Sequence, residues 1–164
     1  MRKIIATLLA ALLLLSMGTA LAEAGMPNPW TETTKEGLMD ALGLTLGVPE
    51  GATNVQWRML EEAQMGELLF TWYDLDYTAR VVPADGFEDI SGIYIDWEQR
   101  ADCTVGRCAG VCYRGHSGEN DIDLCLWYDE LTGLMYSVST QFYDLNGFDI
   151  LAAAEQVFVP MQTE

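Results

Sequence analysis

Four cysteines are the residues whose type and spacing bear most directly on the chemistry of this chain. They are Cys103, Cys108, Cys112 and Cys125, spaced C-x4-C-x3-C-x12-C. The spacing lacks the C-x2-C pairs of zinc ribbons and the C-x-x-C of thiol oxidoreductases. Two disulfides are the simplest expectation for four cysteines if the chain is exported, as its N-terminus predicts below. A metal site and free or redox-active thiols are the alternatives.

Three disulfide connectivities are open to four cysteines, and we expect Cys103–Cys108 with Cys112–Cys125. A tight turn at Val105-Gly106 would place the first two cysteines opposite each other on antiparallel strands. A turn within residues 115–122 would do the same for the second two.

His116, the single histidine, lies beside Ser117 in a glycine-rich stretch. A serine hydrolase needs its nucleophile and base to meet in space, oriented by a third group, and no G-x-S-x-G elbow is present. One histidine also falls short of the ligand set of a zinc hydrolase. We therefore expect His116 to be an exposed loop residue, and we predict no catalytic residue, no metal ligand and no cofactor.

The acidic residues allow two further chemistries. The stretch 119–123, E-N-D-I-D, gathers oxygen atoms of the kind that calcium prefers, so a weak calcium site there is the alternative to a solvated turn. Asp96 and Glu98 share the polar face of an expected strand, and glycosidases use such pairs. With 25 acidic residues in the chain, however, any one pair carries little information.

The N-terminus predicts export. Arg2 and Lys3 precede an apolar run over residues 4–15, and Ala20-Leu21-Ala22 forms an A-x-A site that places cleavage before Glu23. The run is shorter than the roughly 20 apolar residues of a membrane span. We therefore expect a signal peptide over 1–22, a single domain over 23–164, and a location outside the cell or on the extracellular side of its envelope.

The net charge of −17 becomes −19 when residues 1–22, which hold two basic residues and no acidic one, are removed. Such a charge argues against nucleic acid and against direct binding to an anionic membrane, because both partners demand Lys and Arg. An envelope or extracellular partner of unknown identity remains.

Hydrophobic patterning predicts an α+β fold. It consists of one antiparallel sheet of about six to seven strands, with an N-terminal and a C-terminal helix packed on one face. The first helix has Thr33 and Glu36 as a capping box and ends at Gly43; the last is capped by Asn146. Strands are expected from residue 55, over 68–73, 77–82, 93–99, 124–129 and 134–140, and on both sides of the turns that pair the cysteines.

Several stretches carry a resemblance to a known group: Pro27-Asn28-Pro29-Trp30, Phe87–Gly92, Leu126–Asp129, Gly133–Ser137 and the closing amphipathic helix. The chain resembles small exported domains of unknown function from Gram-positive, often gut, bacteria, which are similar to domains found in lipoproteins and beside anti-sigma factors. The resemblance implies fold and localisation, and it brings no catalytic residue.

Aromatic residues are spread over both parities of the expected strands. Where Trp127 faces inward, Leu126 and Tyr128 face outward, with Tyr136 as a cross-strand neighbour. Either loops cover this second face, the sheet curls into a cup, or an aromatic surface is open to a partner. We expect a non-enzymatic binding domain that uses Leu126, Tyr128 and Tyr136; a small extracellular hydrolase with carboxylate chemistry is the alternative.

Overall fold

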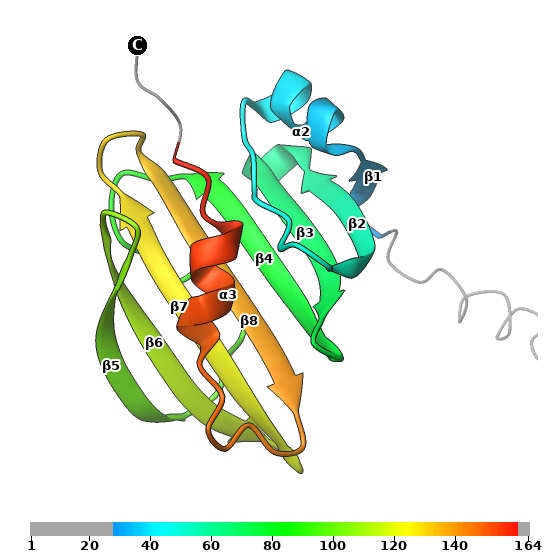
Figure 1. The fold of residues 1–164 in the computed structure, drawn as a ribbon. Coiled ribbons are helices and arrows are strands. Elements are labelled where there is room, and N and C mark those ends of the chain that lie inside the picture. Colours follow the sequence, from blue (N-terminus) through cyan, green and yellow to red (C-terminus); the bar gives the residue numbers. More distant parts are fainter. Residues whose placement is uncertain (1–27, 161–164) are drawn as a thin grey trace, which may run out of the picture.

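The computed structural model describes residues 28–160, which form one eight-stranded antiparallel sheet with two helices (Figure 1). The strands are β1 (Thr31–Thr33), β2 (Thr53–Leu60), β3 (Met65–Trp72), β4 (Leu75–Pro83), β5 (Trp97–Val105), β6 (Cys108–Ser117), β7 (Asn120–Asp129) and β8 (Leu134–Phe142). The helices are α2 (Lys35–Leu42) and α3 (Ile150–Val157), and a 3-10 turn covers Glu61–Ala63. The predicted signal peptide lies outside the described residues. Within them, neither helix is long and apolar enough to cross a membrane.

The α+β class is confirmed, but the sheet has eight strands and not six to seven. One additional strand is the short β1, which pairs with β2 at the edge. The strand predicted over 93–99 is also displaced, because β5 begins only at Trp97. Residues 93–96 pass beneath the sheet instead, with Ile95 and Asp96 close to Gly115 of β6.

The strand order is β1-β2-β3-β4-β8-β7-β6-β5. Neighbours in the sheet are neighbours in the sequence except at β4, which pairs with β8. Strand β5 consequently lies at the far edge, and the segment 84–96 has to cross three strands to reach it. We call 84–96 the crossing segment, and the sheet face that it covers the outer face.

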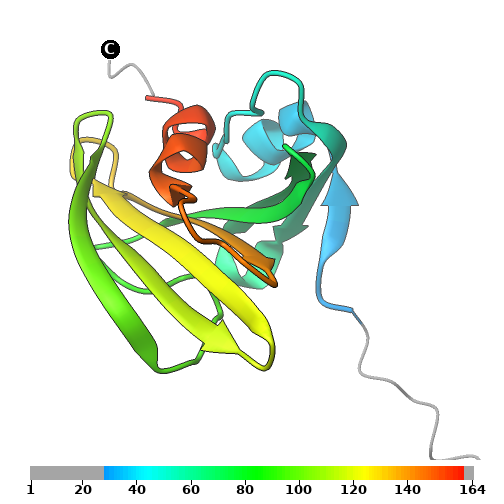
Figure 2. The same cartoon turned by 60° about the horizontal axis from the view of Figure 1, so that its bottom comes forward.

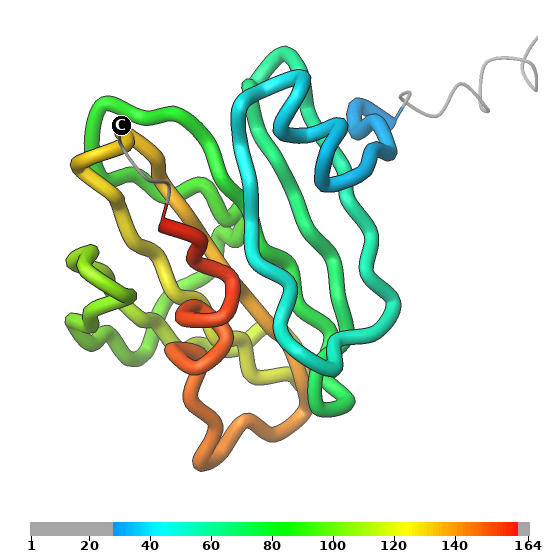
Figure 3. The backbone as a smooth tube through the Cα atoms, turned by 45° about the horizontal axis from the view of Figure 1, so that its top comes forward, coloured from blue at the N-terminus to red at the C-terminus, as the bar shows by residue number. Residues whose placement is uncertain are grey.

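Both helices pack on the opposite face, which we call the helix face, as predicted. Leu38 of α2 and Ala153, Ala154 and Val157 of α3 belong to one buried cluster with Trp127 of β7. The sheet curves around α3, so that this helix lies in its hollow (Figure 2). The connection after α2 runs beside α3, where the Gly47 amide donates to the Val157 carbonyl at 2.7 Å (Figure 3).

Both helices begin at other caps than predicted. The Thr34 hydroxyl, not that of Thr33, accepts from the Gly37 amide at 3.0 Å, because Thr33 is still paired in β1. Asp149, not Asn146, caps α3 and accepts from the Leu151 amide at 3.0 Å. The predicted stop at Gly43 is confirmed, since this glycine has φ 68° and its amide closes the last turn of α2.

Candidate functional site

The three residues predicted to form a binding surface are not brought together. Tyr136 is fully buried on the helix face, where its ring stacks on its cross-strand partner Trp127 at 5.2 Å. Leu126 lies on the outer face but is buried under the crossing segment. Tyr128 is half-buried beside it and donates its hydroxyl to the Ala84 carbonyl at 3.1 Å. The prediction of one exposed aromatic patch is therefore wrong.

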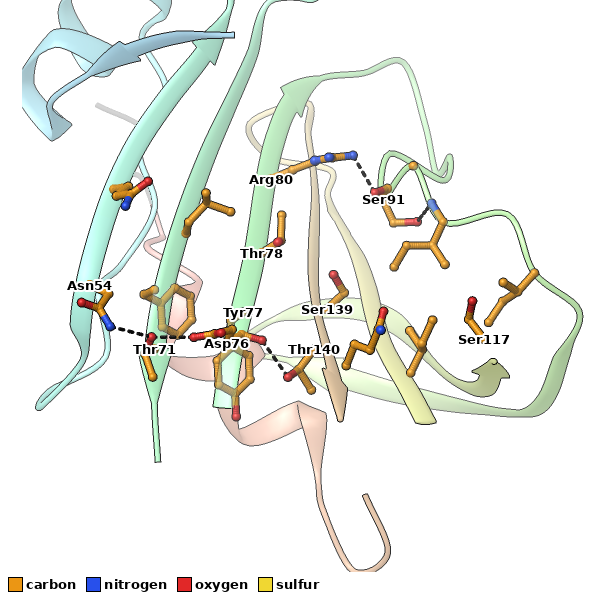
Figure 4. Close-up of a pocket in the computed structure, with 18 of the residues that line it drawn as sticks. Asn54, Thr71, Asp76, Tyr77, Thr78, Arg80, Ser91, Ser117, Ser139 and Thr140 are labelled. Carbon is orange, nitrogen blue, oxygen red and sulfur yellow. Dashed lines mark hydrogen bonds between the residues drawn. The ribbon is translucent and has the colours of Figure 1, made fainter. Parts of the chain in front are cut away.

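The open part of the outer face is a groove on the other side of the crossing segment (Figure 4). Its volume is about 870 Å³, within the usual range of ligand sites. Its floor spans β2, β3, β4, β8 and β7 and reaches Ser117 at the end of β6, and residues 91–95 form a wall. The polar floor and wall residues are Asn54, Gln56, Thr71, Asp76, Thr78, Arg80, Ser91, Ser117, Ser139 and Gln141, and the buried Thr140 lies at one end of the lining.

Strand register explains why hydroxyl and amide groups line up in the groove. Thr78 of β4 is the Cα partner of Ser139 on β8 and of Leu69 on β3. Since side chains alternate between faces, Gln141, two positions after Ser139, also points to the outer face. The groove is thus lined mainly by hydroxyl and amide side chains, with apolar residues such as Leu69 and Ile122 among them.

A short hydrogen-bond chain organises one end of the floor (Figure 4). The Asn54 amide donates to the Thr71 hydroxyl at 3.2 Å, and this hydroxyl donates to the Asp76 carboxylate at 2.6 Å. The Thr140 hydroxyl donates to the Asp76 backbone carbonyl at 2.8 Å. These contacts fix the side chains while leaving the Asn54 carbonyl oxygen as an acceptor for a ligand.

Arg80 attaches the wall to the sheet. Its guanidinium donates to the backbone carbonyls of Ile90 and Ser91, and to the Glu67 carboxylate at 2.9 Å. Glu67 is fully buried and is also bound by Arg58, so one carboxylate holds two arginines. The Trp30 ring lies over both guanidinium groups, at 5.3 Å from Arg58 and 5.5 Å from Arg80, as in cation–π pairs.

Tyr94 is the aromatic residue of the wall, and 94 % of its surface is open to solvent. Ile93 and Ile95, on either side of it, are half-buried against the groove. A ring without protein contacts at the rim of a polar groove is an arrangement suited to stacking on a ligand.

None of the four cysteines lies at disulfide distance from another, and three of them gather on the helix face. Cys112 and Cys125 are Cα partners, as the predicted register requires. The predicted pair Cys103–Cys108 is wrong, because the turn is one residue further on: Val105 faces Cys108, and Cys103 faces Gly110. Cys103 instead joins the other two, with its sulfur 3.4 Å from that of Cys112 and 3.7 Å from that of Cys125.

The thiols differ in acidity. Hydrogen bonding with Cys125, followed by that with Cys103, lowers the pKa of Cys112 to about 7 against the opposing effect of burial. Burial raises the pKa of Cys103 to about 12 and that of Cys108 to about 11. Hydrogen bonding with Cys112, together with burial, also raises the pKa of Cys125. Cys112 is thus the thiol that ionises first.

The carboxylates of residues 119–123, where a weak calcium site was the alternative to a solvated turn, are not gathered into a ligand cluster. Asp123 is buried and binds Arg114 through two hydrogen bonds of 2.6 Å. Asp121 contacts the His116 ring at 2.7 Å and accepts from the Leu145 amide. Among the described residues, the three sulfurs are the only group of three or more potential ligand atoms of Cys, His, Asp or Glu within 4.8 Å of one another.

His116 lies in β6 and not in a loop, with its second nitrogen 3.3 Å from Glu98.

The polar residues of β4 and β8 that line the groove can be read from the sequence, but the pairing of these two strands across the sheet cannot. Comparison with models of protein families, with curated proteins and with solved structures gave no match. The resemblance to exported domains of unknown function stays a prediction.

Proposed function

We propose that this protein is an exported, non-enzymatic binding domain whose groove on the outer face takes an uncharged, polyhydroxylated ligand such as an oligosaccharide. The observation that carries this proposal is the chemistry of the groove. Hydroxyl and amide side chains dominate its polar lining, and its two charged residues, Asp76 and Arg80, already have partners in the protein.

The charge of the groove differs from that of the chain. The protein carries 25 acidic and 8 basic residues, yet Asp76 is the single carboxylate among the described residues that line the groove. An anionic ligand would find no free cation there, and a cationic ligand no free carboxylate. Neutral groups that donate and accept hydrogen bonds fit this lining best.

The exposed ring of Tyr94 supports the same ligand class. The face of an aromatic ring carries partial negative charge and attracts the polarised C–H groups that sugars present. Amide side chains such as those of Asn54, Gln56 and Gln141 offer a donor and an acceptor at once, which matches the paired hydroxyls of a sugar ring.

The groove also supports binding over carboxylate chemistry. Glycoside hydrolysis by the usual mechanism needs two carboxyl groups, about 5–9.5 Å apart, on either side of the scissile bond. The described part of the groove lining offers Asp76 alone, with its carboxylate held by the Thr71 hydroxyl. A hydrolase in this groove would lack its second carboxyl group.

Calorimetric titration with a panel of soluble neutral tetrasaccharides tests the proposal. We expect at least one to bind, and Gln141→Ala to weaken it about tenfold, the value of a lost hydrogen bond near the upper end of the usual range. Gln156→Ala, which truncates an exposed glutamine on α3, is the matched control and should bind like the wild type. Binding that Gln141→Ala and Tyr94→Ala leave unchanged would contradict the proposed site.

A further inference from the structure

Three sulfur atoms from three adjacent strands form a compact group on the helix face, opposite to the groove. Cys125 of β7 faces Cys112 of β6, and Cys103 of β5 completes the group, which we call the thiol trio. Two of the sulfur–sulfur distances are 3.4 Å and 3.7 Å, and all three sulfurs lie within 4.8 Å of one another.

The pairing of the strands builds the trio. Cys112 faces Ala101 on β5, so Cys103, two residues further on, points to the same face. Its Cα partner is Gly110, where a Cβ atom would lie only 3.0 Å from the Cys103 sulfur and 2.8 Å from the Leu126 carbonyl oxygen. The missing side chain of Gly110 therefore leaves the space into which the Cys103 sulfur leans toward the other two.

The spacing of the trio matches the coordination of a thiophilic cation. Zinc–sulfur bonds of about 2.3 Å in a tetrahedron place neighbouring sulfurs about 3.8 Å apart. A disulfide would require about 2.05 Å between two of them and would leave the third thiol over in the core. A single cation, in contrast, would coordinate all three sulfurs of the trio, because their spacing is close to that of a tetrahedral site.

We propose that Cys103, Cys112 and Cys125 together bind one soft d10 cation of the zinc class. The fourth coordination position is open toward the cavity of about 280 Å³ that Cys112 lines with Asp149, Phe148 and Ile150. Of the three ligands, Cys125 is fully buried, whereas Cys103 and Cys112 are partly exposed, so the cation enters from the Cys112 side. A water molecule in that cavity completes the tetrahedron.

Bound metal also accounts for three thiols in a protein that we propose to be exported. Thiols in an oxidising compartment tend to form disulfides, and a cation that holds all three thiolates competes with this reaction. Cys108, the fourth cysteine, is buried away from the trio and gives the chain an internal control.

Metal titration of the reduced, metal-free full chain tests the proposal. We expect one Zn²⁺ per chain by competition with a chromophoric chelator, and one Co²⁺ with the intense sulfur-to-cobalt charge-transfer absorption of a tetrahedral thiolate site. Cys112→Ser and Cys103→Ser should each weaken binding by about 100-fold or more. Cys108→Ser should leave affinity and spectrum unchanged. The two partly exposed ligands are chosen because their serine variants are the ones most expected to fold, which circular dichroism checks.

Three results would overturn the proposal. The first is a wild-type chain that takes up no Zn²⁺ or Co²⁺ at micromolar concentration. The second is binding that Cys103→Ser and Cys112→Ser leave intact. The third is protein purified from its native compartment without reductant that contains no metal and a bridge between Cys112 and Cys125, as shown by peptide mapping. None of these bears on the groove, so the two proposals fail separately.

Discussion

Replacing Glu67 with glutamine should destabilise the protein by about 3 kcal/mol, because it removes the negative charge that holds Arg58 and Arg80 together. Glu67 is fully buried, and breaking a buried ion pair by removing one partner costs about 3–5 kcal/mol. The lower end applies here, since the two arginine side chains keep 27 % and 20 % of their surface exposed and the glutamine retains one acceptor oxygen. For a domain of this size the melting temperature should fall by about 10 °C.

Chemical denaturation of wild type and Glu67→Gln, with the melting temperature as a second readout, measures this cost. Asp102→Asn is the matched control, because it makes the same change of acid to amide in the exposed pair Arg100–Asp102. That pair has 56 % and 81 % of its side-chain surface exposed, so water screens the two charges and the loss of the pair should leave the unfolding midpoint almost unchanged. If Glu67→Gln lowered the unfolding free energy no more than Asp102→Asn does, the ion pairs of Glu67 with Arg58 and Arg80 would not be what attaches the crossing segment to the sheet.

Three further changes test other parts of the structure. Gly92→Ala should lower the free energy of unfolding by about 1–2 kcal/mol and weaken ligand binding, because φ is 71° at this glycine and the new Cβ would lie 2.7 Å from the Arg80 guanidinium. The control Gly86→Ala, whose Cβ would have no atom within 4 Å, should change neither the unfolding free energy nor the ligand affinity. Leu38→Ala should lower the free energy of unfolding by about 2–5 kcal/mol, because Leu38 is the fully buried residue of α2. Met39 is 40 % exposed, so Met39→Ala should lower it by less than about 0.5 kcal/mol. In reduced, metal-free protein, the alkylation rate of Cys112, followed by mass spectrometry, should rise as the pH passes about 7, because its thiolate forms around this pKa. The alkylation rate of Cys108, whose pKa is about 11, should stay low up to pH 9. Equal rates for the two thiols would show that the trio does not acidify Cys112.

Local signals in the sequence predicted the elements that depend on local chemistry. Gly43 ends α2 because it takes a left-handed conformation at little cost. The strands predicted over 68–73 and 77–82 are confirmed as β3 and β4. The register that places Cys112 opposite Cys125 was also predictable, since a turn within 115–122 fixes it.

Predictions failed where the outcome depended on one residue of register. The turn between β5 and β6 consists of Gly106 and Arg107, and not of Val105 and Gly106, with φ 56° at the glycine. This one-residue difference moves the partner of Cys103 from Cys108 to Gly110 and so creates the thiol trio. The sequence predicted strands on both sides of this turn, but it did not determine the position of the turn itself.

The groove lay beyond sequence reasoning because it depends on the order of strands in space. Alternation showed that Thr78 and Ser139 each face away from their buried neighbours, but only the pairing of β4 with β8 makes them Cα partners. That same pairing sends the crossing segment over the outer face, where it buries Leu126 and leaves the groove open beside residues 91–95. The expected binding surface of Leu126, Tyr128 and Tyr136 is therefore not formed, whereas the alternative in which a loop covers this face holds for Leu126.

The most direct test of the proposed function is a map of amide chemical shifts during titration with the oligosaccharide that binds most tightly in the calorimetric panel. We expect the shifted amides to belong to the groove floor on β3, β4 and β8 and to the wall over residues 91–95, and the amides of α3 to remain unshifted. Shifts that concentrate on the helix face, or no shifts with any neutral oligosaccharide, would contradict the assignment of the groove as the binding site.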